Sequence, residues 1–255
     1  MTTGAGKTRV DVLLVERGLV PSRERARAYI LAGRVLVNEQ KIDKPGTVVA
    51  GDAPVRLLGD DPPYVSRGGL KLAAALEHWK IAVAGRGCLD IGTSTGGFTD
   101  CLLQHGAAHV TDVDTGFGQI AMKLRNDPRV HLMERTNARL LEPGALAAAE
   151  GSSELTLLVM DVSFISATLL LGPVLAAAPS LAEAVVLVKP QFEAGRENVG
   201  KGGIVRDPEA HQLAVDRVAE CVRSLGWDVV ETIPSPITGA EGNREFLLYA
   251  RRVGA

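Results

Sequence analysis

Residues 87–106, GCLDIGTSTGGFTDCLLQHG, carry the strongest indication of how this chain folds. A short apolar run, GCLDI, leads directly into Gly92, a few small residues and the pair Gly96 and Gly97, after which a helical pattern begins. A buried strand that ends in glycines and leads into a helix is typical of ligand-binding α/β sheets. Glycine lets the backbone approach a ligand closely, and the first helical turn directs free N–H groups towards it. The stretch therefore predicts a ligand-binding loop at the edge of an α/β sheet.

Apolar strands separated by helices continue after this loop. Such a pattern is typical of a parallel sheet covered by helices on both faces, and we expect a helical stretch after each strand. A predicted helix around residues 208–225 precedes two further strands, which suggest an antiparallel hairpin at the edge of a mostly parallel sheet. The predicted strands are GCLDI (87–91), HVTDV (109–113), RVHLM (129–133), LTLLVMD (155–161) and AVVLVK (184–189), with WDVVETIP and REFLLYARR as the hairpin.

The first 58 residues differ from the rest in charge and pattern. They carry ten Lys and Arg against six Asp and Glu, whereas residues 59–255 carry 18 against 24. Ser22 is expected to cap a helix that Gly33 ends, and short alternating runs after it predict a small sheet. A basic unit on an acidic body indicates contact with a polyanion, although a solvated basic surface would look the same. The candidate phosphate contacts are Arg23, Arg25, Arg27, Arg34 and Lys41.

These patterns divide the chain into a disordered tail (residues 1–8), a small α+β domain (9–58), a linker (59–66) and a larger domain (67–255). Of the 255 residues 46% are hydrophobic and 23% charged, which excludes wholesale disorder. The sequence lacks an apolar run long enough to span a bilayer and a signal-peptide core, so we expect a cytoplasmic protein. Cys88, Cys101 and Cys221 lack metal-ligand spacing, so we expect buried free thiols and no metal.

The glycine loop differs from a dinucleotide-binding motif, because Ser94 stands where the second glycine belongs. Asp90 at the strand end would repel a pyrophosphate, but it would attract the cationic amino or sulfonium group of S-adenosylmethionine. Asp112 and Asp114 follow about 20 residues later, where an acid can hydrogen-bond to a ribose. S-adenosylmethionine therefore fits both acids better than NAD does, and a purely structural turn is the remaining alternative.

Seven motifs, in order along the chain, resemble one family: SRGGLKL, DIGTSTGGFT, RNDPRV, ERTNAR, DVSFIS, VKPQFEAGR and GNREFLL. The whole chain resembles the TlyA family of haemolysin A-type rRNA 2′-O-methyltransferases. Its first domain resembles the αL RNA-binding domain of a ribosomal protein and of pseudouridine synthases, and its body resembles the FtsJ branch of Rossmann-like methyltransferases. The resemblance implies S-adenosyl-L-methionine as cofactor and ribosomal RNA or ribosomal subunits as partner.

The resemblance also implies which residues act. Lys71, Asp161, Lys189 and Glu245 would form a catalytic tetrad beside the sulfonium. A lysine can accept a proton only when it is neutral, which a second lysine nearby favours by repulsion. We expect Lys189 to take the proton of the 2′-hydroxyl, Asp161 and Glu245 to orient Lys189, and Lys71 to hold the 2′-oxygen. The cofactor would lie against Asp90, Gly92, Ser94, Gly96, Gly97 and Phe98, with Asp114 at the ribose and Asn137 or Ala138 near the adenine.

The target predicted from the resemblance is a cytidine of the large ribosomal subunit. The chain ends at Ala255 without the C-terminal helix of members that modify both subunits, so the small subunit stays an open alternative. Three other functions remain open at this point. A non-catalytic ribosome-binding or assembly factor would keep the fold without the chemistry, a haemolysin would act on membranes, and a small-molecule O-methyltransferase would leave the basic first domain unexplained.

Overall fold

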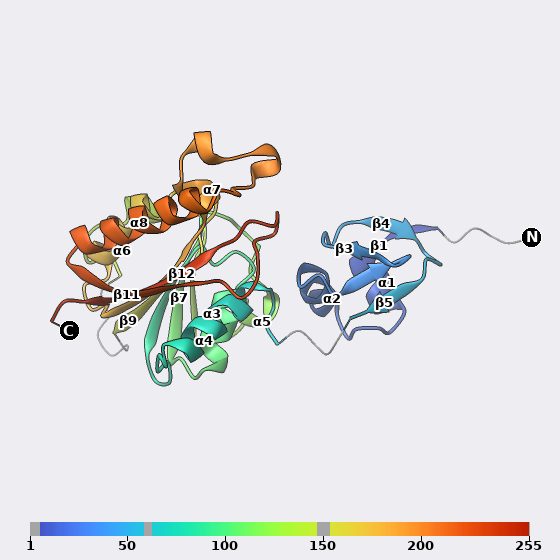
Figure 1. Cartoon of the computed structure of the whole chain (residues 1–255). Coiled ribbons are helices and arrows are strands. Elements are labelled where there is room, and N and C mark those ends of the chain that lie inside the picture. The colour runs from blue at the N-terminus through green and yellow to red at the C-terminus, as the bar shows by residue number, and fades with distance from the viewer. Residues whose placement is uncertain (1–5, 59–62, 147–153, 255) are drawn as a thin grey trace, which may run out of the picture.

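The computed structural model describes residues 6–58, 63–146 and 154–254, which form two units of unequal size (Figure 1). The smaller N-terminal unit, called the head below, comprises residues 6–58, and the larger unit, called the body, comprises the described residues from 63 onwards. Part of the predicted linker, residues 59–62, and part of the predicted tail, residues 1–5, lie outside the described residues.

The head packs two helices against short antiparallel strands. Ser22 caps the second helix as predicted, because its side chain accepts a hydrogen bond from the Arg25 N–H at 3.2 Å, and Gly33 follows that helix with a φ of +67°. The prediction of a disordered tail was wrong for Lys7 and Thr8, which pair with a later strand. The elements are β1 (Lys7–Arg9), α1 (Val10–Glu16), α2 (Arg23–Leu31), β2 (Val35–Val37), β3 (Gln40–Ile42), β4 (Val48–Ala50) and β5 (Val55–Leu57).

The body contains a seven-stranded sheet in the order β11-β12-β10-β9-β6-β7-β8, so the predicted α/β fold is confirmed. Strands β6 to β10 are parallel, and β12 lies antiparallel between β10 and β11. The last strand of the chain is thus inserted into the sheet, with β11 at its edge. The strands are β6 (Gly87–Ile91), β7 (His109–Val113), β8 (Val130–Met133), β9 (Leu155–Met160), β10 (Glu183–Val188), β11 (Trp227–Pro234) and β12 (Phe246–Arg252).

Helices cover both faces of this sheet, with α3 and α4 on one side and α6 and α8 on the other (Figure 1). A helical stretch follows each of the five predicted parallel strands, but after β7 it is only α5 (Met122–Arg125) and after β8 only a 3₁₀ turn, because Gly116, Gly118, Pro143 and Gly144 interrupt the chain. The helices are α3 (Gly68–His78), α4 (Gly97–Gln104), α5 (Met122–Arg125), α6 (Thr168–Ala177), α7 (Pro190–Glu193) and α8 (Pro208–Ser224), with 3₁₀ turns at Ala138–Leu140, Arg196–Asn198 and Lys201–Gly203.

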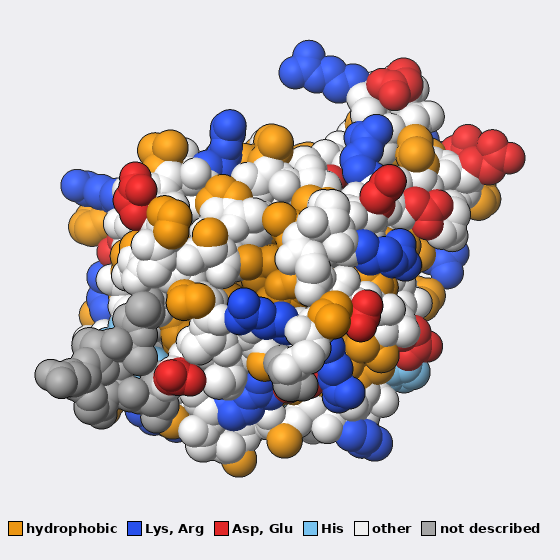
Figure 2. All heavy atoms as spheres, turned by 90° about the vertical axis from the view of Figure 1, so that its left-hand side faces the viewer, with side chains coloured by type: hydrophobic (Ala, Val, Ile, Leu, Met, Phe, Trp, Pro, Cys, Tyr) orange, Lys and Arg blue, Asp and Glu red, His pale blue; other side chains and the backbone are white. Residues whose placement is uncertain are grey.

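The three cysteines differ in burial, and the surface of the body carries charges of both signs (Figure 2). Cys88 and Cys101 are buried free thiols as predicted, whereas Cys221 is only half-buried. On the face of the body turned away from the head, basic and acidic side chains are interspersed (Figure 2). Among the described residues, no helix combines the length and the apolar character needed to cross a bilayer.

The topology brings distant residues to one edge of the sheet. Strands β6, β9 and β10 run in parallel, so the residues that follow them, Gly92, Asp161 and Lys189, lie at the same carboxyl edge. Strand β12 runs in the opposite direction, so Glu245, which precedes it, lies at this edge too. The first turn of α3 adds Lys71.

Candidate active site

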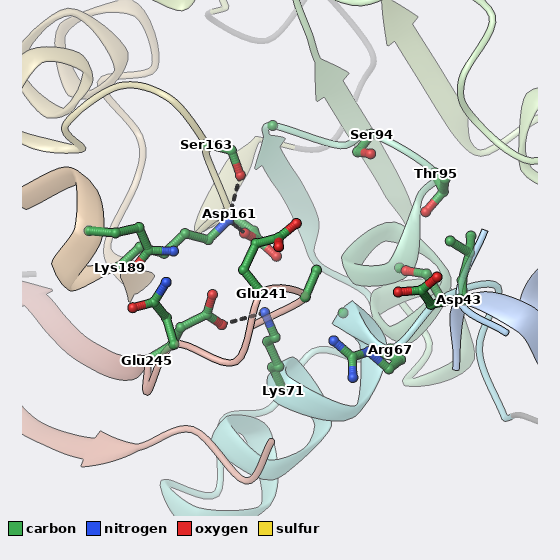
Figure 3. Close-up of a pocket in the computed structure, with 18 of the residues that line it drawn as sticks. Asp43, Arg67, Lys71, Ser94, Thr95, Asp161, Ser163, Lys189, Glu241 and Glu245 are labelled. Atoms are coloured by element: carbon green, nitrogen blue, oxygen red, sulfur yellow. Dashed lines mark hydrogen bonds and ion pairs between the residues drawn. The ribbon is translucent and has the colours of Figure 1, made fainter. Parts of the chain in front are cut away.

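A cavity of about 930 Å³ opens at the carboxyl edge of the sheet (Figure 3). Its lining combines the glycine loop with all four residues of the predicted tetrad, which come from four separate parts of the chain. Lys41, Asp43 and Lys44 of the head also line it, so the cavity lies where the two units meet. A cavity of this size is in the range of small-molecule binding sites.

The tetrad forms two ion pairs within the cavity. Nζ of Lys71 lies 2.5 Å from Oε2 of Glu245, and these side chains are only 8% and 3% exposed. Nζ of Lys189 lies 2.6 Å from Oδ1 of Asp161 and donates a hydrogen bond to Oγ of Ser163 at 2.8 Å. An unpaired charge at such burial would be costly, so each partner stabilises the charge of the other.

Local structure explains how Lys71 is held. It lies in the first turn of α3, where the helix dipole disfavours a cation, and Glu245 supplies the compensating charge. The start of α3 is also closely packed, since a Cβ atom on Gly69 would lie 2.3 Å from the ring of Tyr64. Gly239 packs closely against the partner of Lys71, since a Cβ atom on Gly239 would lie 2.5 Å from Oε1 of Glu245.

The glycine loop forms a backbone cradle beside these charges. Gly92 and Gly96 have φ values of +86° and +92°, and Ser94 has a φ of +50°. A Cβ atom on Gly92 would lie 2.5 Å from the carbonyl oxygen of Asp161, and one on Gly97 would lie 2.3 Å from Oγ of Ser66. A side chain at Gly92 or Gly97 would collide with these neighbours, so glycine lets the loop from Gly92 to Thr95 pack closely at the border of the cavity.

Two buried acids lie beneath this loop. Oγ of Thr99 is 2.7 Å from Oδ2 of Asp90 and 2.8 Å from Oδ1 of Asp112, and both carboxyl groups are fully buried. Burial raises the pKa of Asp90 to about 7 and raises the pKa of Asp112 well above its ordinary range. One hydroxyl carries a single proton, so Thr99 can donate to only one of the two acids at a time. The arrangement therefore favours a proton shared within the pair.

The predicted cofactor residues divide into two groups. Gly92, Ser94, Gly97 and Phe98 line the cavity. Asp90 does not reach the lining, and its Oδ1 lacks a hydrogen-bond partner among the described residues. Gly96, Asp114, Asn137 and Ala138 are likewise outside the lining.

The ends of β7 and β8 lie to the side of the cavity. Asp114 accepts hydrogen bonds from the backbone N–H groups of Ser94 at 2.8 Å and Gly116 at 2.6 Å, so it braces the glycine loop. Asn137 is exposed and caps the 3₁₀ turn that begins with the buried Ala138. No cluster of three or more metal-ligating side chains occurs in the described ranges.

The predicted RNA-contacting residues of the head lie in different surroundings. Lys41 is exposed and lines the cavity, and Arg27 is exposed on α2. Arg23 is exposed as well, but its Nη2 lies 2.9 Å from Oδ2 of the fully buried Asp11, so it also stabilises the head. Arg25 and Arg34 are half-buried.

Sequence reasoning missed two residues beside the tetrad. Ser163 bonds to Lys189, and Phe164 is 92% exposed although it lines the cavity. The φ of Phe164 is +66°, a strained conformation that costs about 1–3 kcal/mol and is typical of functional sites. Its ring lies 5.5 Å from that of Phe192. The available signal was an aromatic residue next to a serine, four residues after the apolar strand β9 ends at Met160.

Sequence and structure comparisons identify close relatives. The profile of the FtsJ-like methyltransferase family matches residues 64–252, and that of the S4 domain matches residues 8–55. The 16S/23S rRNA (cytidine-2′-O)-methyltransferase TlyA of Mycobacterium tuberculosis is 46% identical over 97% of this chain and 91% of its own length. Hemolysin A of Brachyspira hyodysenteriae is 38% identical over 94% of this chain and 98% of its own length. A solved structure of a hemolysin-named protein from Streptococcus thermophilus has 40% identity and a TM-score of 0.74, covering 98% of this chain and 90% of that chain.

Proposed function

Because the chain belongs to the FtsJ-like methyltransferase family, we propose that it methylates the ribose 2′-hydroxyl of a cytidine in ribosomal RNA, with S-adenosylmethionine as the methyl donor. The relative from Mycobacterium tuberculosis is named for this reaction, and the similarity covers nearly all of both chains. The observation that carries the proposal is the pairing of Lys71 with Glu245 and of Lys189 with Asp161 in one cavity beside the glycine loop.

The residues present fit the cofactor. The glycine cradle leaves backbone groups open to a ligand, and Oδ1 of Asp90 is a buried acceptor without a partner beneath it. S-adenosylmethionine would supply an electrophilic methyl group when bound. Asp114 would hold its ribose, Asn137 or Ala138 would lie near its adenine, and the remaining contacts would come from Gly92, Ser94, Gly96, Gly97 and Phe98.

The two lysines have different surroundings, which supports different roles. Lys71 is paired with a carboxylate that is almost fully buried, and this lysine would hold the 2′-oxygen. Lys189 is held by Asp161 and Ser163, which direct its amine. In its neutral form Lys189 would accept the proton of the 2′-hydroxyl while the oxygen takes the methyl group. Holding the reactants in line contributes several kcal/mol in addition to the proton transfer.

The S4 head would bring the RNA to this cavity. Lys41 and Lys44 extend the basic surface of the head into the cavity lining, where they can contact phosphates. The exposed ring of Phe164 can stack on the target base, since every base has a π-face. A ribosomal substrate would place the protein in the cytoplasm, and large-subunit RNA is the first target to test, with small-subunit RNA as the alternative.

Mapping of ribose methylation by mass spectrometry tests this proposal. Unmodified ribosomal RNA of each subunit is incubated with the protein in the presence and absence of S-adenosylmethionine. We expect one added methyl group on the ribose of a cytidine, only with the cofactor and not with the Lys189→Met variant. RNA that binds the protein but gains no methyl group would instead support the non-catalytic assembly factor.

A haemolysin is the other function that a relative suggests, because the Brachyspira hyodysenteriae protein carries that name. The paired tetrad in the cavity favours the methyltransferase, since a membrane-active protein has no need of such an arrangement. A dye-leakage assay with liposomes separates the two functions: leakage without any RNA methylation would support the haemolysin.

A further inference from the structure

A buried carboxylate outside the tetrad, that of Glu193, connects the two segments that meet at Lys189. Glu193 lies at the end of α7, four residues after Lys189, and is only 2% exposed. Its Oε1 accepts a hydrogen bond from the backbone N–H of Ala167 at 2.7 Å, and its Oε2 accepts one from Oγ of Ser166 at 2.5 Å. Burial raises the pKa of Glu193, and no Lys or Arg side chain of the described residues forms an ion pair with it.

Both hydrogen bonds go to the loop between β9 and α6, residues 161–167. This loop carries Asp161, Ser163 and Phe164, the first two of which contact Nζ of Lys189. The guanidinium of Arg217 on α8 donates to the carbonyl oxygen of Glu193, so α7 itself is anchored to a long helix. Glu193 therefore fastens the loop that carries the partners of Lys189 to the segment that carries Lys189.

The strained residue of this loop is held by the same contacts. Phe164 has a φ of +66°, and its ring is exposed to solvent. A residue with a side chain adopts such a strained backbone angle only where the surrounding structure holds it there. Directly after Phe164 and Ile165, the bonds of Ser166 and Ala167 to Glu193 fix the backbone, and Ser166 also bonds to Oγ of Thr168 at 2.7 Å. The orientation of Phe164 thus depends on the anchor that Glu193 provides.

We propose that Glu193 is a positioning residue for methyl transfer, which holds Asp161 and Ser163 against Lys189 and keeps the Phe164 ring at the mouth of the cavity. This inference rests on the proposed function. Glu193 lies outside the cavity lining, so its loss should slow the chemical step and leave the binding of S-adenosylmethionine unchanged, while the displaced Phe164 ring should weaken RNA binding slightly.

Substitution of Glu193 tests the proposal by steady-state methylation of ribosomal RNA. Glu193→Gln keeps the shape of the side chain but can accept only one of the two hydrogen bonds, and Glu193→Ala loses both. We expect kcat to fall about tenfold in Glu193→Gln and about a hundredfold in Glu193→Ala, because small displacements of reacting groups have effects of this size. The dissociation constant of S-adenosylmethionine should stay within about twofold, and KM for RNA should rise only a few-fold through the displaced Phe164 ring.

A second readout is the pH profile of kcat. The carboxylate of Asp161 stabilises the charged form of Lys189, so an enzyme in which Asp161 has moved away should reach its full rate at a lower pH. A merely structural carboxylate would change the amount of folded enzyme and leave this profile unchanged.

Glu183→Gln is the matched control. Glu183 lies at the start of β10, at the opposite end of the strand from Lys189, and it accepts hydrogen bonds from Arg86 and Tyr249. We expect this variant to have a lower melting temperature but an unchanged kcat and pH profile.

Four outcomes of these experiments have different meanings. Glu193 variants with a normal kcat and pH profile, or a Glu183→Gln variant with the same kinetic defect, refute positioning by Glu193. If both Glu193 variants fail to fold, Ser166→Ala decides the matter, since it removes one hydrogen bond and should lower kcat a few-fold at an unchanged dissociation constant of S-adenosylmethionine. A wild-type protein that does not methylate RNA would refute the proposed function itself and is thereby distinguished from both.

Discussion

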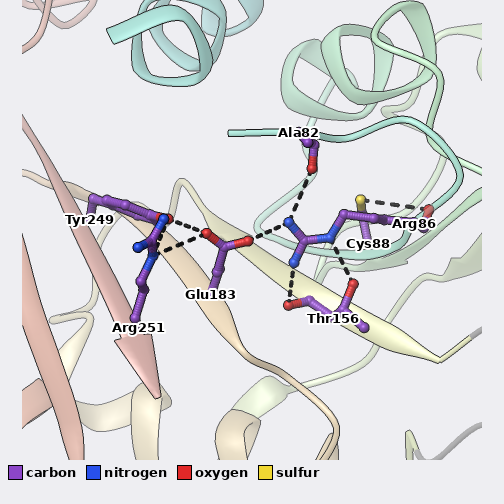
Figure 4. A network of polar contacts seen from close by, with 7 residues as sticks. All are labelled: Ala82, Arg86, Cys88, Thr156, Glu183, Tyr249 and Arg251. Carbon is purple, nitrogen blue, oxygen red and sulfur yellow. Dashed lines mark hydrogen bonds and ion pairs between the residues drawn. The ribbon is translucent and has the colours of Figure 1, made fainter. Parts of the chain in front are cut away.

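The two ends of strand β10 carry charged groups at similar distances and in different surroundings. At the amino end, Nη1 of Arg86 lies 2.5 Å from Glu183, and the same guanidinium donates to the side chain and the carbonyl oxygen of Thr156 and to the carbonyl oxygen of Ala82 (Figure 4). At the carboxyl end, Nζ of Lys189 lies 2.6 Å from Asp161, beside a cavity.

The two ends differ in how many hydrogen-bonding atoms of the charged groups have partners within the protein. Glu183 accepts from Arg86, Tyr249 and Arg251, so its oxygens are occupied by neighbouring protein groups. Each ammonium of the tetrad has three N–H groups and borders open space, so donors remain available to a ligand. Arginine suits the closed network through its several fixed donors, and lysine suits the open one because it can lose its proton. A short ion pair alone therefore does not indicate a catalytic site, and an incompletely satisfied pair beside a cavity is the better candidate for one.

The largest effect should come from a charge-conserving exchange at the carboxyl end. Lys189→Arg keeps the positive charge but cannot release a proton, so we expect methyl transfer to fall about 10²–10⁴-fold while S-adenosylmethionine still binds. Arg86→Lys is the corresponding exchange at the amino end. It should lower the free energy of unfolding by about 1–3 kcal/mol and leave the rate per folded molecule unchanged. Equal loss of activity in both variants would contradict the distinction between the two ends.

A second variant disturbs the tetrad without removing any of its members. The new Cβ atom of Gly239→Ala would lie 2.5 Å from Oε1 of Glu245 and displace this carboxylate from Lys71. We expect the methylation rate to fall about 10–100-fold with little change in RNA affinity. Gly172→Ala in α6 is the control, because its Cβ atom would contact only Leu225 at 3.8 Å. That variant should gain up to about 1 kcal/mol of stability at full activity.

The stability of the protein should depend on pH in opposite ways through Asp90, near the carboxyl end of β6, and through Glu183, at the amino end of β10. Burial raises the pKa of Asp90 from 3.8 to about 7, so the stability linked to its protonated form is full below pH 4 and is lost as the pH rises through 7. Burial also opposes ionisation of Glu183, but hydrogen bonds from Tyr249 and Arg86 outweigh it and lower its pKa. The stability that Glu183 contributes is therefore present at neutral pH and lost in acid.

Thermal unfolding between pH 4 and pH 8 measures this contrast. Thr99→Val removes the hydroxyl shared by Asp90 and Asp112, and it should cost about 1–3 kcal/mol, with the largest loss above pH 7. The destabilisation by Glu183→Gln should instead be largest near neutral pH and shrink in acid. Thr111→Val on β7, a half-buried residue, is the control and should follow the wild type. A Thr99→Val variant with the pH dependence of the wild type would argue against a shared proton.

The smallest effect concerns where the RNA approaches. Lys41→Ala removes a cation from the cavity lining and should weaken RNA binding a few-fold, lowering the slope of log affinity against log salt by about one. Arg252→Ala removes a cation at the far end of β12 and should leave both the affinity and the slope unchanged. Equal slopes for both variants would mean that RNA does not approach by the carboxyl end.

Local patterns predicted most of the elements. Strands β6 and β7 have the predicted limits, and the Ser22 cap and the Gly33 stop lie where expected, because each depends on a few neighbouring residues. The differences from prediction have two kinds of cause. Lys7 and Thr8 pair with β4, about 40 residues later, which no local pattern reveals, whereas the local glycine and proline residues after β7 and β8 leave only a short helix and a 3₁₀ turn there.

The candidate site, like the fold, could be predicted only in part from local sequence patterns. The motifs indicated the four charged residues, and the structure brings them together. No local sequence pattern predicts that β12 lies between β10 and β11. This arrangement brings Glu245 to Lys71. Ser163, Phe164 and Glu193 were also missed, because their importance lies in contacts between segments and in one backbone angle.

Hydrophobic periodicity and glycine act over a few residues, so the order of strands and helices along the chain, the glycine loop and the residue types available for chemistry follow from local sequence. The packing of the folded chain sets which lysine meets which carboxylate, which charges border a cavity, and which are closed off by neighbours. Those choices depend on strand order and burial, which set both the distance between groups far apart in the chain and the cost of leaving a charge unpaired.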